Sequence, residues 1–172
     1  VKQFGGTLQL DSQPGKGSTF YFTLQLPLGA SVKSFADPLP SAQYIPFTGV
    51  RALIAEDNPV NLNIALKFLE KWGITCSVAH NGKEAVDLFK KGIFDLVILD
   101  IEMPIMDGRQ VIQEIRKKDA HLPALAFTAD ILGQQMDELL QLGFTDHIHK
   151  PFQPLHLYEK IQSLLFSKQN IA

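Results

Sequence analysis

The pattern of apolar and polar positions divides the 172-residue chain into parts that follow different periods. In residues 1–28, apolar positions recur at every second residue, which predicts β-strands that bury one face. Residues 12–17, with the sequence SQPGKG, interrupt this alternation with turn-forming Pro and Gly. We therefore expect a β-hairpin with strands near residues 7–11 and 19–26. Its apolar face would comprise Leu8, Leu10, Phe20, Phe22, Leu24 and Leu26.

The middle and the C-terminal part of the chain follow a different pattern. Residues 29–49 show neither period and carry prolines among Ser, Ala and Gly, which is typical of a linker. Through residues 50–168, short apolar runs alternate with longer stretches of helical period, and residues 169–172 would form a tail. This alternation predicts a doubly wound α/β fold, with a five-stranded parallel sheet covered on both faces. The expected strands lie near residues 52–55, 76–79, 96–99, 124–127 and 145–148.

The stretch that follows the first of these strands has a clear helical period. Its apolar residues recur at spacings of three and four, so we expect them to pack on the sheet. Three glycines stand where helices of this pattern would end, which is typical of C-terminal caps. These glycines are Gly73, Gly92 and Gly143. The expected buried face of the first helix comprises Val60, Ile64, Phe68, Leu69 and Trp72.

Composition and charge restrict the class of protein. The chain is 45% hydrophobic and 20% charged, as ordinary globular proteins are. Its formal net charge of -2 gives no basic excess that would favour nucleic acid or an anionic membrane. No apolar run approaches the ~20 residues of a membrane-spanning helix, and no signal peptide is evident. The single cysteine, Cys76, excludes an intrachain disulfide and fits a reducing compartment. Because Val1 is not a natural start, we expect a piece of a longer polypeptide.

Polar side chains stand where the predicted strands end. Because open parallel sheets bind ligands beyond the carboxyl ends of their strands, we expect these side chains to meet at one edge. In chain order they are Glu56, Asp57, Asp100, Thr128 and Lys150.

The chemistry of this group predicts a metal site that supports phosphoryl transfer. Clustered carboxylates repel one another and need a cation, and oxygen ligands without His or Cys favour Mg²⁺, Mn²⁺ or Ca²⁺ over zinc. Mg²⁺ suits best a site that leaves room for water and a phosphoryl oxygen. Lys150 and the hydroxyl of Thr128 suit phosphate oxygens. Asp100, central among these groups, is the candidate nucleophile that would form an acyl phosphate.

Four stretches of residues 51–168 resemble the receiver domain of two-component and phosphorelay signalling. They are AEDNPVN (55–61), VILDIEMPIMDG (97–108), FTAD (127–130) and HIHKPF (147–152). The resemblance implies a flavodoxin-like sheet of strand order 2-1-3-4-5. It also implies a phosphoprotein of signal transduction, in which Asp100 is the phosphoacceptor.

The same resemblance implies a role for each remaining site residue. Asp57, Asp100 and the backbone carbonyl of Glu102 would bind Mg²⁺ directly, and Glu56 would act through water. Lys150 would hold the phosphoryl group, and Thr128 would be the switch hydroxyl. The bond between Lys150 and Pro151 would be cis. The family places Tyr or Phe at the position of His147, so a switch at this position would depend on the charge of the imidazole.

The N-terminal hairpin is similar to another protein family. Residues 4–28, FGGTLQLDSQPGKGSTFYFTLQLPL, resemble the C-terminal end of a histidine-kinase ATP-binding domain. The order of kinase tail, linker and receiver implies a hybrid sensor histidine kinase whose catalytic core would lie upstream. The implied partners are the kinase core of the same polypeptide and a His-containing phosphotransfer protein. The implied location is the cytoplasm, with a parent that an upstream sensor region could anchor in a membrane.

Two other functions and one further contact remain open. A Mg²⁺-dependent phosphatase with an Asp nucleophile would need the pattern Asp-x-Asp-x-Thr and a substrate cap, which the loop after Asp100 does not supply. A flavin-binding module would need a phosphate-cradling loop in place of Glu56 and Asp57. The lone hairpin would bury its apolar face, and we expect a homodimer through it as one outcome.

Overall fold

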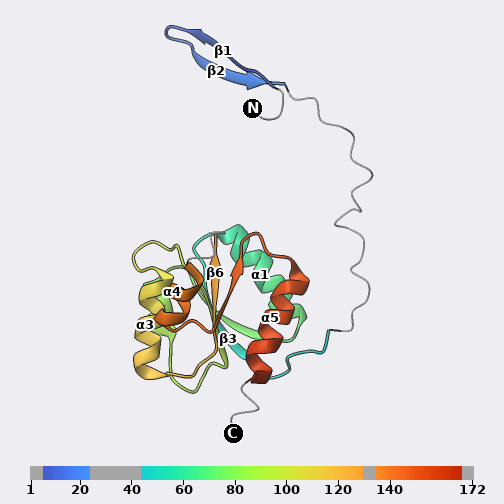
Figure 1. Cartoon of the computed structure of the whole chain (residues 1–172), viewed down its shortest axis with the longest axis vertical. Coiled ribbons are helices and arrows are strands. Elements are labelled where there is room, and N and C mark those ends of the chain that lie inside the picture. The colour runs from blue at the N-terminus through green and yellow to red at the C-terminus, as the bar shows by residue number, and fades with distance from the viewer. Residues whose placement is uncertain (1–5, 24–43, 130–134, 168–172) are drawn as a thin grey trace. The chain divides into compact units, whose positions relative to one another are not determined.

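The chain forms two compact units, residues 1–43 and residues 44–172, and each has its own fold. The structure is a computed structural model, and it describes residues 6–23, 44–129 and 135–167 (Figure 1). Across these described ranges, none of the helices is long and apolar enough to cross a membrane.

The first unit is an antiparallel hairpin of β1 (Leu8–Gln13) and β2 (Gly17–Phe22). The turn is closed by a hydrogen bond of 3.0 Å from the Lys16 N–H to the Gln13 carbonyl. Gly15 in this turn has a φ of 79°, a conformation that glycine adopts without steric cost. The predicted hairpin is therefore confirmed.

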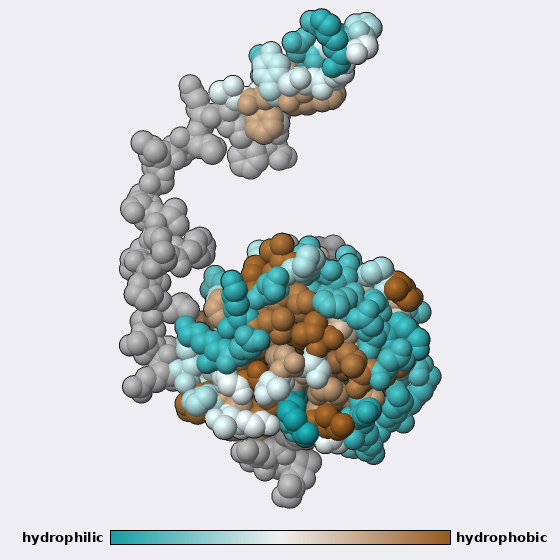
Figure 2. Space-filling view, turned by 180° about the vertical axis from the view of Figure 1, so that it is seen from behind, coloured by the Kyte–Doolittle hydropathy of each residue, from teal (hydrophilic) through white to brown (hydrophobic). Residues whose placement is uncertain are grey.

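One face of the hairpin is apolar and exposed. The register places Leu8 opposite Phe22 and Leu10 opposite Phe20, so the four side chains share a face. Each of them is more than half exposed. Figure 2 shows apolar surface gathered along one side of the hairpin. The other predicted members of this face, Leu24 and Leu26, lie outside the described residues.

The second unit is built on a five-stranded parallel sheet with the order β4-β3-β5-β6-β7. Because β3 is the first strand of this unit, the order is 2-1-3-4-5 when counted within it, as predicted. All strand pairs are parallel, and β5 and β6 are buried along their whole length. The strands are β3 (Arg51–Ala55), β4 (Thr75–Ala79), β5 (Leu96–Asp100), β6 (Ala124–Thr128) and β7 (Asp146–His149).

Helices cover both faces of the sheet and divide the core into two clusters. One cluster packs α1 and α5 on one face, and the other packs α2, α3 and α4 on the opposite face (Figure 1). Such two-sided cover is what the crossovers between parallel strands require. The helices are α1 (Pro59–Lys71), α2 (Gly82–Leu88), α3 (Gly108–Lys118), α4 (Gln135–Leu142) and α5 (Pro154–Ser167).

The buried face of α1 differs from the prediction. The helix buries Leu62, Ala65 and Leu69, whereas Val60 and Ile64 are 63% and 44% exposed. The predicted face was wrong at these two positions, because it left out Leu62 and Ala65, which the helix buries instead. The helix therefore presents two aliphatic side chains to solvent next to its N-terminus.

The second unit begins before the predicted boundary at residue 50. Phe47 is buried, and its N–H donates to the carbonyl of Trp72 at 2.7 Å. Tyr44 packs on Trp72 and on Tyr158 with ring centroids 5.7 and 4.7 Å apart. The Tyr158 hydroxyl donates to the carbonyl of Ile45 at 3.0 Å. Residues 44–50, which we call the strap, thus pack against α1 and α5, although residues 29–49 were predicted as linker.

Candidate functional site

The predicted site residues lie together at the carboxyl edge of the sheet. Glu56 follows β3, Asp100 ends β5, Thr128 ends β6 and Lys150 follows β7. The strands are parallel, so their carboxyl ends meet at the same edge. This is the edge at which open α/β sheets bind ligands.

Lys150 joins two acids that come from different strands. Its Nζ lies 2.8 Å from Asp100 Oδ2 and 3.1 Å from Glu56 Oε2. Burial by itself lowers the pKa of this ammonium, but Asp100 and then Glu56 raise the pKa above its usual value by hydrogen bonding and charge. The amine is therefore held charged between the two carboxylates.

Glu56 is the most deeply buried acid of the described residues, with no exposed surface. Burial, and next the charge of Asp100, raise the pKa of this carboxyl, while Lys150 and the amide of Asn61 act in the opposite direction. Asp100 is also nearly buried, at 3% exposed. Two desolvated carboxylates next to each other repel and gain from any additional cation.

The acids of this edge fit a hard divalent cation. Oxygen atoms of Glu56, Asp57 and Asp100 all lie within 4.8 Å of one another, and Asp57 is exposed. Among the described residues this is the one group of three His, Cys, Asp or Glu side chains so arranged. Its donors are all oxygens, and its open side leaves room for water. These are the properties that Mg²⁺ requires of a protein site.

The loop after β5 is folded tightly against Asp100. The Glu102 N–H donates to Asp100 Oδ1 at 3.2 Å, and the Gly108 N–H donates to the Ile101 carbonyl at 3.0 Å. A Cβ at Gly108 would collide with the backbone carbonyl of Asp100. Asp107 forms a capping box with Gln110 at the start of α3, so it closes the loop.

The tip of this loop holds a strained, exposed residue. Ile105 has a φ of 72°, which is sterically unfavourable for a β-branched side chain, and it is 82% exposed. The Met106 N–H donates to the Pro104 carbonyl at 2.8 Å across it, which makes a γ-turn. The turn holds an apolar side chain outward on the loop that follows the candidate phosphoacceptor.

Thr128 and Lys150 are connected through the backbone. The Lys150 N–H donates to the Thr128 carbonyl at 2.7 Å, and the bond between Lys150 and Pro151 is cis, as the resemblance implied. Thr128 is buried, with 6% of its surface exposed.

His147 lies on β7, three residues before Lys150, and is mostly buried. Its ring packs edge-on against His149, with centroids 4.8 Å apart, and its Nδ1 lies 3.6 Å from Asp146 Oδ1. Burial, then the neighbouring His149 and Lys160, lower the pKa of His147 despite the charge of Asp146. The imidazole at this position is therefore held neutral.

One polar neighbour of the site was not predicted from the sequence. Asn61 lies in the first turn of α1 and donates its amide N–H to Glu56 Oε1 at 3.2 Å. A signal for it is present, because Asn58 and Pro59 mark the start of a helix, and side chains three residues after such a cap often reach back.

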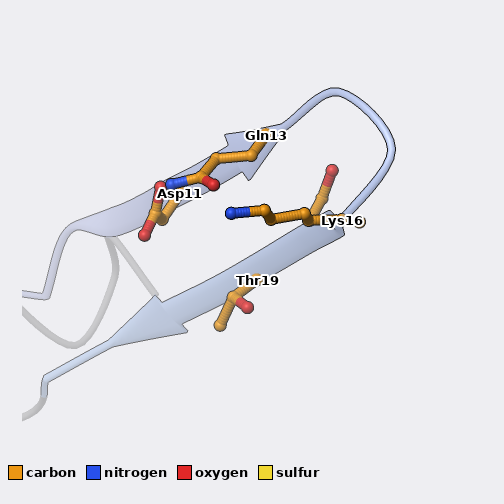
Figure 3. A pocket seen from close by; sticks show the side chains of 6 residues that line it. Asp11, Gln13, Lys16 and Thr19 are labelled. Carbon is orange, nitrogen blue, oxygen red and sulfur yellow. The ribbon is translucent and has the colours of Figure 1, made fainter.

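The hairpin carries a polar hollow of its own. Asp11, Gln13, Lys16 and Thr19 line it together with Gly17 and Ser18, and Figure 3 shows the Lys16 side chain lying along it. Its lining contains a single acid and a single amine, whose charges balance. We assign no chemistry to this hollow.

The sequence of the second unit matches a known protein family over most of its length. The model of the response regulator receiver domain matches residues 52–162. The chain belongs to this family. The match includes the acids after β3, Asp100, Thr128 and Lys150. The phosphatase and the flavin-binding alternatives gain no support from it.

The curated relatives that the chain matches are longer signalling proteins. The chain is 36% identical over 154 residues to the aerobic respiration control sensor protein ArcB of Escherichia coli K12, and the match covers 88% of the chain. It is 34% identical over 164 residues to the hybrid signal transduction histidine kinase K of Dictyostelium discoideum, with 89% of the chain covered. The matches span only 19% and 13% of these two proteins.

Solved receiver structures share the fold. The receiver domain of the sensor histidine kinase PA1611 from Pseudomonas aeruginosa PAO1, solved with a magnesium ion in its active-site cleft, is 29% identical. It superposes with a TM-score of 0.64, and 69% of this chain and 99% of that chain are covered. The receiver domain of Saccharomyces cerevisiae Ssk1, solved with the histidine phosphotransfer protein Ypd1, is 27% identical. It has a TM-score of 0.64, with 69% of this chain and 90% of that chain covered.

Proposed function

We propose that this receiver accepts a phosphoryl group on Asp100 in the presence of Mg²⁺. The observation that carries the proposal is the position of Lys150 Nζ, 2.8 Å from Asp100 Oδ2, beside three carboxylates whose oxygens lie within 4.8 Å of one another. A cation and a metal-binding cluster around one carboxylate are what phosphoryl transfer needs to neutralise the charge that develops.

Each residue has a distinct role in this reaction. An oxygen of Asp100 attacks the phosphorus of a phosphohistidine, the bond from phosphorus to nitrogen breaks, and the imidazole leaves with the electron pair. Oδ2, which faces Lys150, is the attacking oxygen, and the amine neutralises the phosphoryl oxygens. Thr128 then supplies a hydroxyl to the bound phosphoryl group.

The metal would be held by Asp57, Asp100 and the Glu102 carbonyl, with Glu56 acting through water. When bound, Mg²⁺ supplies positive charge to the oxygens of the transferred group. The raised pKa of the buried Glu56 carboxyl supports this assignment, because a nearby dication would favour its charged form.

We further propose that the receiver belongs to a hybrid histidine kinase and exchanges its phosphoryl group with histidine-bearing partners in the cytoplasm. Its relatives include such kinases, and the related Ssk1 receiver was solved with a histidine phosphotransfer protein. Three exposed aliphatic side chains lie on α1 and on the loop after β5, the elements that carry or adjoin Glu56 and Asp100, and they would offer apolar contacts to such a partner. They are Val60 and Ile64 on α1 and Ile105 on the loop after β5. Residues 1–28 would then be the end of the kinase ATP-binding domain, and the receiver would comprise residues 50–168 together with the strap that precedes them.

The test is phosphorylation by a small donor. Incubation with acetyl phosphate and Mg²⁺, followed by intact mass, is expected to show one added phosphoryl group. Asp100→Asn is expected to lose it, and Asp57→Ala is expected to lose the phosphorylation that depends on Mg²⁺. Asp87→Asn is the matched control, because Asp87 is an exposed acid paired only with Lys83 among the described residues. A phosphoryl group that persists in Asp100→Asn would contradict the proposal.

A further inference from the structure

The carboxylate of Glu56 is held from two sides. Oε2 accepts from Lys150 Nζ at 3.1 Å, whereas Oε1 accepts from the Asn61 amide at 3.2 Å and from the Asn58 N–H at 3.3 Å. The acid has no exposed surface, so water does not substitute for a lost donor without rearrangement. The orientation of Glu56 toward the site therefore depends on what holds Oε1.

Asn61 is placed for this task by the start of α1. Asn58 is the N-cap, and its side-chain oxygen accepts from the N–H groups of Val60 and Asn61 at 2.9 and 3.4 Å. The side chain of Asn58 is thus committed to the helix, and it contributes only its backbone N–H to Glu56. Asn61 is the one residue whose side-chain amide reaches Glu56 among the described contacts.

We propose that Asn61 is a positioning residue that directs Glu56 toward the metal by holding Oε1 on the side of α1. This rests on the proposed function, because it assigns a task to Glu56 in the Mg²⁺ site. With Oε1 fixed, Oε2 faces Lys150, whose Nζ also contacts Asp100. Without the amide, Oε1 retains a single backbone donor, and the carboxylate is free to turn away from the site.

The variants compare two asparagines of the same helix. Asn61→Leu removes the donor and keeps the side-chain size, and Asn61→Gln restores an amide. Asn63→Leu is the matched control, because Asn63 is exposed on α1 and takes no part in the site. If the role of Asn61 were purely structural, its replacement by Leu would lower stability and leave the metal affinity unchanged.

Two readouts separate positioning from folding and from turnover. The first is the Mg²⁺ concentration for half-maximal phosphorylation by acetyl phosphate, measured together with the maximal rate. The second is direct binding of Mn²⁺ to the unphosphorylated full chain, followed by its EPR signal. Thermal unfolding without metal reports whether each variant is folded.

Asn61→Leu is expected to raise the half-maximal Mg²⁺ concentration and the dissociation constant for Mn²⁺ by about three- to tenfold, since a hydrogen bond to a charged group is lost. Its maximal rate is expected to remain near that of the wild type. Asn61→Gln is expected to recover part of the metal affinity, and Asn63→Leu to match the wild type.

Equal values of these two quantities for Asn61→Leu and Asn63→Leu would overturn the inference. So would an Asn61→Gln variant that binds metal no more tightly than Asn61→Leu. If the wild type bound Mn²⁺ but took up no phosphoryl group, the proposed function would fail. The Mn²⁺ titration would still decide the role of Asn61.

Discussion

At the scale of single residues, the charge balance of the site depends on Lys150. It is the one described cation within ion-pair distance of Glu56 and Asp100, and both acids are buried. Removing one partner from a buried ion pair leaves uncompensated charge, which costs far more than the intact pair contributes. The amine therefore stabilises the fold as well as serving the reaction.

Lys150→Ala is accordingly expected to lower the free energy of unfolding by about 3 kcal/mol without metal. Mg²⁺ is expected to restore more stability to this variant than to the wild type, because the cation replaces the lost charge. Urea unfolding with and without Mg²⁺ measures both effects. Lys83→Ala, which removes an exposed pair with Asp87, is the control. A variant as stable as this control would show that Lys150 is not needed to compensate the acids.

His147 gives stability a pH dependence of known sign. Its pKa in the folded protein is lowered by burial and by His149 and Lys160, while Asp146 opposes the shift. The unfolded chain therefore takes up a proton first as the pH falls through about 6.5, and stability is lost until the folded-state pKa is passed. Above that window the group adds no pH dependence.

His147→Phe is expected to remove this contribution. Between about pH 5 and pH 7.5 its free energy of unfolding should fall less steeply on acidification than that of the wild type. Urea unfolding at several pH values measures the slopes, and His121→Phe, at an exposed histidine, is the control. Parallel slopes for His147→Phe and the wild type would show that this imidazole titrates alike in both states.

At the scale of elements, the strap completes the core beside α1 and α5. It brings Phe47 and Tyr44 onto Trp72 and Tyr158, in an aromatic cluster with centroid distances of 4.7 to 5.7 Å. Trp72 is only 1% exposed. Since burying one large apolar side chain contributes about 1.5–3 kcal/mol, the strap is part of the folded receiver.

Two truncations test this role of the strap. A chain that begins at residue 44 is expected to be as stable as the receiver within the full chain. One that begins at residue 50 should lose about 2–4 kcal/mol, because the burial of Phe47 and Tyr44 is lost. Trp72 is the only tryptophan, so its fluorescence reports directly, and a red shift is expected only for the shorter chain. Identical spectra and stabilities would reassign residues 44–49 to the linker.

At the scale of the whole molecule, the hairpin has an apolar face without a core of its own. Leu8, Leu10, Phe20 and Phe22 are each more than half exposed. An isolated two-stranded hairpin is marginal in water, and open strand edges readily pair with other strands. In a complete hybrid kinase this face would pack on the kinase core. Without that core, we expect it to pack on the hairpin of a second copy of the chain.

We therefore expect the full chain to be a dimer, and a chain without residues 1–30 to be a monomer. Mass in solution, measured by light scattering over a range of concentrations, gives the result. Replacing Phe20 and Phe22 by Thr in the full chain is the milder variant and should act in the same direction. A dimer that survives the deletion would assign the contact to the receiver.

Much of the fold follows from sequence because its signals are local. Continuous apolar runs at β5 and β6 identify strands buried on both faces, and Gly73 and Gly143 follow the ends of α1 and α4 with φ of 83° and 109°. The prediction was wrong at Gly92, because α2 already ends at Leu88 and Gly92 lies in a turn beyond it. Parallel strands place all carboxyl ends at one edge, so the positions of the acids, Thr128 and Lys150 after their strands are enough to group them. The family resemblance added the strand order and the cis bond before Pro151.

Tertiary packing decided what local pattern could not. Val60 and Ile64 have the helical spacing of a buried face, yet α1 turns Leu62 and Ala65 inward, because the helix packs by the fit of its surface to the sheet. The same orientation of α1 brings Asn61 to Glu56. Lys150, which is 94 residues away from Glu56 in the sequence, contacts the same acid. The sequence alone determined which chemical groups this receiver carries and at which edge they gather. Only the folded structure decided which oxygen each donor holds, since hydrogen-bond partners depend on orientation in space.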